Sequence, residues 1–244
     1  MGQVIVITSG KGGTGKTTAC AAVSSCLAAL GHRTLAIDCD VGLRNLDISL
    51  GMSEFAVSDI ADVAGGRTPL HDAAHEHPEL PGLFFLSAPL YKPESAISEE
   101  MAEQLFDMAR ESFEYVLVDS PAGLGSGFEF AVRYADSAIV VATADPASIR
   151  NAARAVETLR ELEHTDIRLL LNKVDRAGWS RYNTTVDDII DAAGARLIGV
   201  VRDDSAVPFA AADEALLVLY SRGLASHGFL DTARRLRGED IPIN

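Results

Sequence analysis

The chain has 244 residues, which is enough for one large α/β domain with a full hydrophobic core. Its formal net charge of −14 repels nucleic acid, so a nucleic-acid partner is not expected. No apolar run reaches the roughly 18 residues of a transmembrane helix, and the first strand begins too early for a signal peptide. Three scattered cysteines are too few for a disulfide framework. We therefore expect a cytoplasmic protein.

Apolar, strand-like runs alternate with helical stretches along the chain. The strands are expected at 3–8, 34–37, 83–86, 115–118, 138–141, 167–171 and 196–201. The helices are expected at 17–30, 99–112, 147–163, 184–193 and 224–236. This alternation predicts an α/β fold with a mostly parallel twisted sheet and helices on both faces. Because neither a repeat nor a low-complexity linker interrupts it, we expect a single domain over 1–244, with ligands at the carboxyl ends of the strands.

The first expected strand leads into the glycine-rich sequence GKGGTGKT at 10–17, which fits the phosphate-loop pattern G-x-x-x-x-G-K-[ST]. Its glycines allow sharp turns, so that backbone N–H groups and the next helix start can cradle phosphate. Lys16 is expected to reach the β- and γ-phosphates, and the Thr17 hydroxyl to bind Mg²⁺. The residues expected to hold the phosphates are Gly10, Lys11, Gly12, Gly13, Thr14, Gly15, Lys16, Thr17 and Thr18. We therefore expect a P-loop NTPase with three α/β/α layers.

Lys11 is a second lysine that the ordinary phosphate-loop pattern does not require. Within one chain, the phosphates already bound by Lys16 have little use for another cation. The extra charge therefore suggests a nucleotide site that is completed by two subunits.

Aspartates follow two of the expected strands at the end where ligands bind. Asp119 has the position of the aspartate that holds Mg²⁺ through its water shell. Asp38 is expected to hold the hydration shell of the metal, and Asp40 to orient and deprotonate the attacking water, although the reverse assignment stays open. Gly123 can present a bare N–H group to the γ-phosphate.

Three histidines, His71, His75 and His77, lie together in an acidic stretch. Histidines at i and i+4 can share a helix face and bind a metal. A solvated polar loop is the favoured interpretation here.

Residues 10–18, 37–47 and 119–123 together resemble the deviant Walker A ATPases of the ParA/MinD family. The resemblance implies a hydrolase that uses ATP/ADP and Mg²⁺ and forms an ATP-sandwich homodimer. It also implies that Lys11 reaches across to the partner's phosphates and acts in catalysis with Lys16 and Asp40. For MinD-type members it implies a spatial switch in selection of the cell-division septum site, with MinC-like and MinE-like partner proteins, at the inner face of the cell membrane.

Asn172 follows the strand at 167–171, and the resemblance makes it the contact to adenine. The sequence NKVD at 172–175 also fits the Asn-Lys-x-Asp motif that reads guanine in many GTPases, where the aspartate accepts hydrogen bonds from the base. The phosphate loop with Lys11 and the segment 38–47 favour ATP over GTP.

A second loop beside the base is expected after the last strand. Arg202 and Asp203 occupy this position and are candidate nucleotide contacts. Arg202 stands where relatives often carry proline, so its side chain is expected either to stack on the purine or to point into solvent.

The resemblance implies peripheral membrane binding through a C-terminal amphipathic helix. The last expected helix, 224–236, has a stripe of Leu230, Ala233 and Leu236 that is expected to pack on the protein's own core. The residues after it are acidic and interrupted by Pro242, which does not suit anionic lipid. We expect the anchor either to be truncated from this chain or to be replaced by a partner protein.

Two other functions fit the same motifs. A ParA-type partition ATPase or a flagellar-positioning ATPase shares the phosphate loop, but a net charge of −14 disfavours DNA binding. A nucleotide-gated adaptor without hydrolysis is disfavoured because Lys11, Lys16 and Asp40 are all present.

Overall fold

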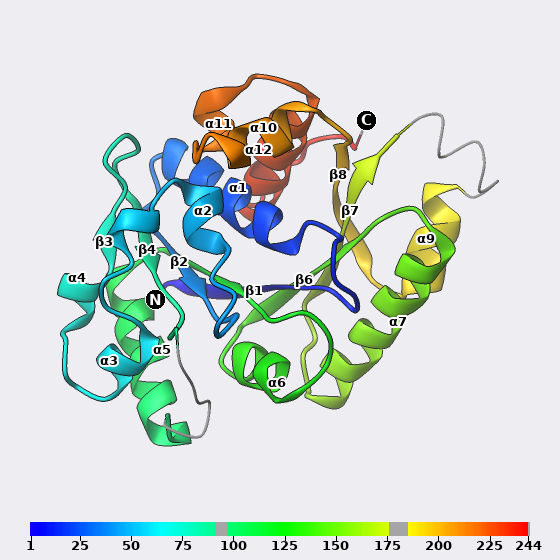
Figure 1. Ribbon diagram of the computed structural model, residues 1–244. Coiled ribbons are helices and arrows are strands. Elements are labelled where there is room, and N and C mark those ends of the chain that lie inside the picture. Colours follow the sequence, from blue (N-terminus) through cyan, green and yellow to red (C-terminus); the bar gives the residue numbers. More distant parts are fainter. Residues whose placement is uncertain (91–96, 176–184, 244) are drawn as a thin grey trace.

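The computed structural model describes residues 1–90, 97–175 and 185–243. Within them, eight strands form one sheet in the order β3-β4-β2-β5-β1-β6-β7-β8, and all neighbouring pairs are parallel except β3 and β4 (Figure 1). The strands are β1 (Gln3–Thr8), β2 (Thr34–Asp38), β3 (His75–Glu76), β4 (Leu83–Leu86), β5 (Tyr115–Asp119), β6 (Ser137–Ala142), β7 (Ile167–Val174) and β8 (Arg196–Arg202). The expected mostly parallel α/β sheet is confirmed.

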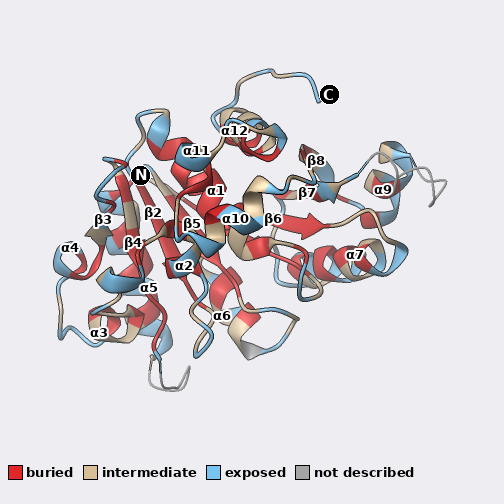
Figure 2. Cartoon of the chain, turned by 45° about the horizontal axis from the view of Figure 1, so that its top comes forward, coloured by how far each residue is buried: buried red, intermediate tan, exposed pale blue. Residues whose placement is uncertain are grey.

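Helices cover both faces of the sheet, as Figure 1 shows. One face carries α1 (Lys16–Ala29), α2 (Leu46–Leu50), the 3₁₀ turn η1 (Ser53–Phe55), α10 (Ala206–Ala212), α11 (Leu217–Tyr220) and α12 (Leu224–Leu236). The other carries α3 (Ile60–Ala64), α4 (Leu70–Ala73), α5 (Glu99–Ser112), α6 (Ser126–Arg133), α7 (Pro146–Glu161) and α9 (Val186–Ala193). Each layer closes its own hydrophobic core against the buried strands (Figure 2).

Helix α1 is buried on nearly every side because α12, α11 and α2 pack on the face that turns away from the sheet. Most of its residues are small. Two of its buried hydroxyl groups bond within the helix: Ser24 and Ser25 donate hydrogen bonds of 2.6 Å to the carbonyls of Cys20 and Ala21. All three cysteines of the chain are buried and free. The helix that follows the phosphate loop is therefore held firmly in the molecule.

The histidine-containing stretch differs from the expected solvated loop. His75 and Glu76 form the short antiparallel edge strand β3. His77 is only 6% exposed, and its Nε2 lies 3.0 Å from the carbonyl oxygen of Leu50. The expectation of a solvated loop was wrong for His75, which belongs to a strand, and for His77, whose ring is buried by a tertiary contact with α2. His71 is exposed. Among the described residues no three His, Cys, Asp or Glu side chains are grouped to hold a metal.

The strand order makes β1 the switch point of the sheet, with β5 on one side and β6 on the other. Asp119 at the end of β5 is in register with Asp38 of β2 and with Ile7 of β1. The carboxyl ends of these three strands therefore meet, and a crevice at such a switch point is where open α/β sheets bind ligands.

Helix α12 has the bounds that the sequence predicts, and its apolar stripe faces the core. Ala233 and Leu236 are buried, and Leu230 packs against the same cluster. Beyond the helix, the guanidinium of Arg235 donates a 2.7 Å hydrogen bond to the carbonyl of Pro242. No helix in the described ranges combines the length and the apolar character that crossing a membrane requires.

Candidate functional site

The phosphate loop joins β1 to α1 at the switch point of the sheet. Gly13 and Gly15 have φ angles of 82° and 89°, in the left-handed region that favours glycine. A Cβ atom on Gly10 would lie 2.1 Å from the carbonyl oxygen of Asn151, and one on Gly15 would lie 2.2 Å from Nδ2 of Asn172. Glycine at these positions therefore serves both the turn and the close approach of α7 and β7.

The crest of the loop is open, because a Cβ on Gly12 or Gly13 would meet no atom within 4 Å. Bare backbone N–H groups beside open space, followed by a helix start, form the kind of cradle that binds anions. Nearby, the buried hydroxyl of Thr14 has no hydrogen-bond partner in the described part of the chain.

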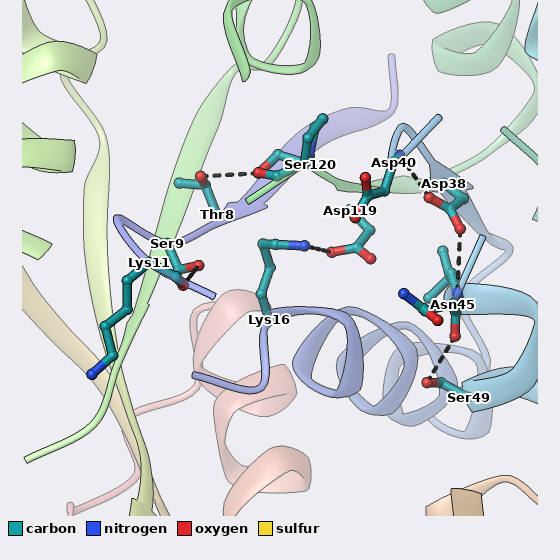
Figure 3. A network of polar contacts seen from close by, with 12 residues as sticks. Thr8, Ser9, Lys11, Lys16, Asp38, Asp40, Asn45, Ser49, Asp119 and Ser120 are labelled. Carbon is teal, nitrogen blue, oxygen red and sulfur yellow. Dashed lines mark hydrogen bonds and ion pairs between the residues drawn. The ribbon is translucent and has the colours of Figure 1, made fainter. Parts of the chain in front are cut away.

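Lys16, the first residue of α1, points from the loop toward the end of β5 (Figure 3). Its Nζ lies 2.9 Å from Oδ1 of Asp119, and the two side chains are 8% and 1% exposed. The structure thus brings together two predicted site residues that are 103 positions apart. A buried cation paired with a buried carboxylate is stable only when both are well satisfied.

The carboxylate of Asp119 is not fully satisfied. Its Oδ2 is buried without a hydrogen-bond partner among the described residues. Burial raises the pKa of Asp119, while the neighbouring Lys16 and Thr17 lower it less than burial raises it. An unpaired carboxylate oxygen beside a threonine hydroxyl suits Mg²⁺, which takes oxygen ligands and keeps several waters. The residues present therefore fit a divalent cation at the predicted positions Thr17 and Asp119.

Asp38 lies beside Asp119 at the end of β2 and is fully buried. Burial, together with the negative charge of Asp119, raises its pKa to about 7. One of its oxygens accepts a hydrogen bond of 2.8 Å from the N–H group of Asp40 (Figure 3), and the other accepts one of 3.2 Å from the N–H group of Leu46. Asp38 therefore ties down both ends of the loop after β2, a structural role that the sequence did not suggest.

Asp40 and Gly123 lie on the two loops that follow β2 and β5. The Asp40 carboxylate is half-buried, and burial raises its pKa more than the charge of Lys16 lowers it. It makes no hydrogen bond to any described residue. Gly123 has a φ of 90°, and a Cβ there would meet nothing within 4 Å. Both residues are thus able to face a bound group.

Lys11 turns away from Lys16 and Asp119, as Figure 3 shows. Its Nζ lies 3.2 Å from Oδ1 of Asp145 within the same chain. Asp145 also caps α7 by accepting a hydrogen bond of 3.0 Å from the N–H group of Ser148. Although burial acts in the opposite direction, hydrogen bonds from these and other donors hold the pKa of Asp145 below its usual value. The sequence did not predict this pairing.

The end of β7 lies against the phosphate loop. Asn172 is 5% exposed, and its Nδ2 donates a 2.9 Å hydrogen bond to the carbonyl of Thr14. Lys173 has a left-handed φ of 54°, and its Nζ donates a 2.9 Å hydrogen bond to the carbonyl of Gly13. The predicted base contact therefore stands directly beside the predicted phosphate cradle.

The loop after β8 lies next to the end of β7, since the N–H group of Asp203 donates to the carbonyl of Val174 at 3.1 Å. The Arg202 side chain is half-buried and Asp203 is exposed. Asp204 accepts hydrogen bonds from the N–H groups at the starts of both α10 and α12. The loop with Arg202 and Asp203 thus lies beside the strand that carries Asn172, and Asp204 fixes it to two helices.

Some residues of the site were missed by sequence reasoning. The Asp-Pro pair at 145–146 is a helix-start signal, but nothing local connects it to Lys11. Lys173 lies inside the Asn-Lys-x-Asp motif, which bears on base selectivity and not on the phosphate loop. Asp204 carries no signal that separates it from Asp203.

Sequence comparison with known proteins also indicates a nucleotide-binding protein. The family model described as the CobQ/CobB/MinD/ParA nucleotide binding domain matches residues 5–218. The septum site-determining protein MinD of Bacillus subtilis is 35% identical over all of this chain and 92% of its own length. The protein of the same name from Escherichia coli K12 is 33% identical over all of this chain and 94% of its own length.

Solved structures give the same result. The MinC:MinD cell division protein complex of Aquifex aeolicus contains a chain that is 36% identical, with a TM-score of 0.91 over 99% of this chain and 98% of that one. MinD of Pyrococcus horikoshii complexed with Mg-ADP has a TM-score of 0.84 over 97% of this chain and 96% of that one. Its identity of 23% supports the fold alone. The extent of these matches shows that this chain belongs to the CobQ/CobB/MinD/ParA family and, within it, to the MinD septum site-determining ATPases.

Proposed function

We propose that this chain is a Mg²⁺-dependent ATPase that acts as a spatial switch in selection of the cell-division septum site. The observation that carries the proposal is the buried pair of Lys16 and Asp119 at the open phosphate loop, with one Asp119 oxygen unpaired. The sequence identity of 35% and 36% with two MinD proteins, over the full length of this chain, supports the role in septum-site selection.

The nucleotide would be held by the phosphate loop from Gly10 to Thr18, with the N–H group of Gly123 near the γ-phosphate. Thr17 and Asp119 would hold Mg²⁺, which offsets negative charge on the β- and γ-phosphates when it is bound. Lys16 would then exchange its bond to Asp119 for bonds to phosphate. On the base side, Asn172 is the proposed adenine contact, and Arg202 with Asp203 forms the neighbouring wall.

Hydrolysis needs a group that orients the attacking water. The free carboxylate of Asp40 supports its assignment to this role over Asp38, whose two oxygens are taken by backbone N–H groups. A pKa raised by burial also makes Asp40 a better proton acceptor. Asp38 would orient the waters around the metal through its charge. It would also hold Asp40 in place through the hydrogen bond that it accepts from the Asp40 N–H group.

The active form would be a homodimer with ATP between the subunits, in which each Lys11 binds the phosphates of its partner. A cation supplied in trans can couple hydrolysis to dimerisation, because the transition-state charge is compensated only in the dimer. The Aquifex MinC:MinD complex supports a MinC-like partner. A MinE-like activator and peripheral binding at the inner face of the membrane extend the same proposal.

The test measures phosphate release by the purified chain with ATP and Mg²⁺, and light scattering of an Asp40→Ala variant. We expect Mg²⁺-dependent turnover of ATP in the unmodified chain. In the variant we expect a shift from monomer to dimer with ATP but not with ADP. An ATP-bound dimer without turnover in the unmodified chain would favour a nucleotide-gated adaptor. A monomer under all conditions would overturn the sandwich dimer.

Sedimentation with liposomes and with DNA separates the related biological roles. Binding of the ATP form to anionic liposomes supports septum-site selection at the membrane. Binding to DNA would instead favour partition, which the net charge of −14 disfavours.

A further inference from the structure

Three backbone carbonyls of the phosphate loop each accept a hydrogen bond of 2.9 Å from a side chain. The pairs are Ser9 Oγ to Lys11 O, Lys173 Nζ to Gly13 O, and Asn172 Nδ2 to Thr14 O. Ser9 directly follows β1, and Asn172 and Lys173 belong to β7, so the loop is held both from its own start and from a separate strand.

Each of these bonds also fixes the direction of an N–H group. A trans peptide is planar, and its C=O and N–H bonds point in opposite directions. The described residues contain no cis peptide bond. Holding the carbonyls therefore orients the N–H groups of Gly12, Thr14 and Gly15 away from the side chains that hold them. None of these three N–H groups donates a hydrogen bond to a residue in the described ranges.

Lys173 makes its contact from an unusual backbone conformation. Its φ of 54° is left-handed, a conformation that is unfavourable for a residue with a Cβ. Its side chain runs along the loop, with Cε 3.7 Å from the position of a Cβ on Gly15, and ends at the Gly13 carbonyl. Backbone strain of this kind persists where the surrounding structure requires it, and it concentrates at binding sites.

We propose that Lys173, together with Asn172 and Ser9, is a positioning residue that presets the phosphate cradle for a polyphosphate. By holding carbonyls on the outside of the loop, these side chains direct the N–H groups of Gly12, Thr14 and Gly15 toward the anion. Lys173 acts through the Thr14 N–H group and does not touch the ligand. The inference rests on the proposed function only in that the loop binds a nucleotide.

The test compares Lys173→Met and Lys173→Arg with Arg196→Met, which removes the same charge from the opposite, amino end of β8. Two probes are titrated: ADP with Mg²⁺, and inorganic pyrophosphate, which has no base. We expect Lys173→Met to weaken both probes by about tenfold, or about 1.4 kcal/mol. Lys173→Arg should restore most of the affinity, and Arg196→Met should change neither.

Amide NMR gives a local readout that loss of charge alone does not move. On addition of ADP, the Thr14 amide of the unmodified chain should shift strongly. In Lys173→Met that shift should be reduced, while the Gly12 amide, held through Ser9, should still respond. Ser9→Ala should produce the reverse pattern, and it also tests the inference if Lys173→Met does not fold.

The possible results separate this inference from the proposed function. Unchanged affinity for both probes in Lys173→Met would overturn it. Weaker ADP binding with unchanged pyrophosphate binding would also overturn it, since Lys173 would then act on the base. If the unmodified chain binds neither probe, the proposed function fails and the inference fails with it.

Discussion

The ammonium group of Lys11 lies 3.2 Å from the carboxylate of Asp145, which caps helix α7 in the same chain. The residue proposed to bind phosphate in the other subunit is thus engaged internally. Lys11 must exchange this partner for phosphate if it is to act across a dimer. The pair therefore opposes dimerisation by an amount set by its own strength.

That strength can be measured with Asp145→Asn, because asparagine caps helices about as well as aspartate. The side chain of Lys11 is 36% exposed, and exposed ion pairs contribute only about 0.2–1 kcal/mol. Since each dimer breaks one such pair in both subunits, about 0.4–2 kcal/mol in total, we expect the concentration for half-dimerisation with ATP, measured by light scattering in an Asp40→Ala background, to fall by roughly two- to thirtyfold.

The matched variant for this prediction is Asp145→Ala, which removes the cap as well as the charge. It should lose about 1 kcal/mol of folding stability that Asp145→Asn retains. If the chain with Asp145→Asn dimerises no more readily than the chain that keeps Asp145, the ion pair does not oppose dimerisation.

Lys11→Ala tests the role of Lys11 itself. We expect ATP turnover to fall on the order of a thousandfold, as when an arginine finger is removed. ADP affinity should stay within about threefold, because the side chain points away from its own phosphate loop. Phosphate release and ADP titration measure the two effects separately. Unchanged turnover would exclude a catalytic role for Lys11.

The parts of the site that the sequence predicts are those encoded by local pattern. The phosphate loop and Asp119 each follow an apolar strand, and parallel strands bring their carboxyl ends together. The pairing of Lys11 with Asp145 spans 134 positions and depends on where α7 docks, which no local pattern encodes. The burial of His77 depends in the same way on the position of Leu50.

Asp38 predicts a pH dependence of folding stability. Burial and the charge of Asp119 raise its folded-state pKa to about 7, from an ordinary value of 3.8. Between these pH values the folded chain keeps a proton that the unfolded chain has lost. The free energy of unfolding therefore falls as pH rises from about 4 to about 7, by at most roughly 4 kcal/mol from this group.

Asp38→Asn removes this contribution, because asparagine resembles the protonated acid and does not titrate. In buffer without nucleotide or metal, urea unfolding at about pH 5 and about pH 8 should show a smaller loss of stability in Asp38→Asn than in the unmodified chain. The exposed Asp203→Asn serves as the control. Equal pH dependence in Asp38→Asn and the unmodified chain would contradict the buried, protonated Asp38.

Gly10→Ala and Gly12→Ala separate two uses of glycine in one loop. At Gly10 a Cβ would lie 2.1 Å from the Asn151 carbonyl, so the methyl group must displace α7 or the loop. We expect the free energy of unfolding to fall by about 1–3 kcal/mol without nucleotide.

At Gly12 a Cβ meets nothing within 4 Å, so stability should change by less than about 0.5 kcal/mol. There the methyl group stands beside the N–H group proposed to bind phosphate, so ADP affinity should fall although the fold is intact. Urea unfolding and ADP titration of both variants measure this contrast, and weaker ADP binding in Gly10→Ala alone would show that the open side of Gly12 does not face the phosphates.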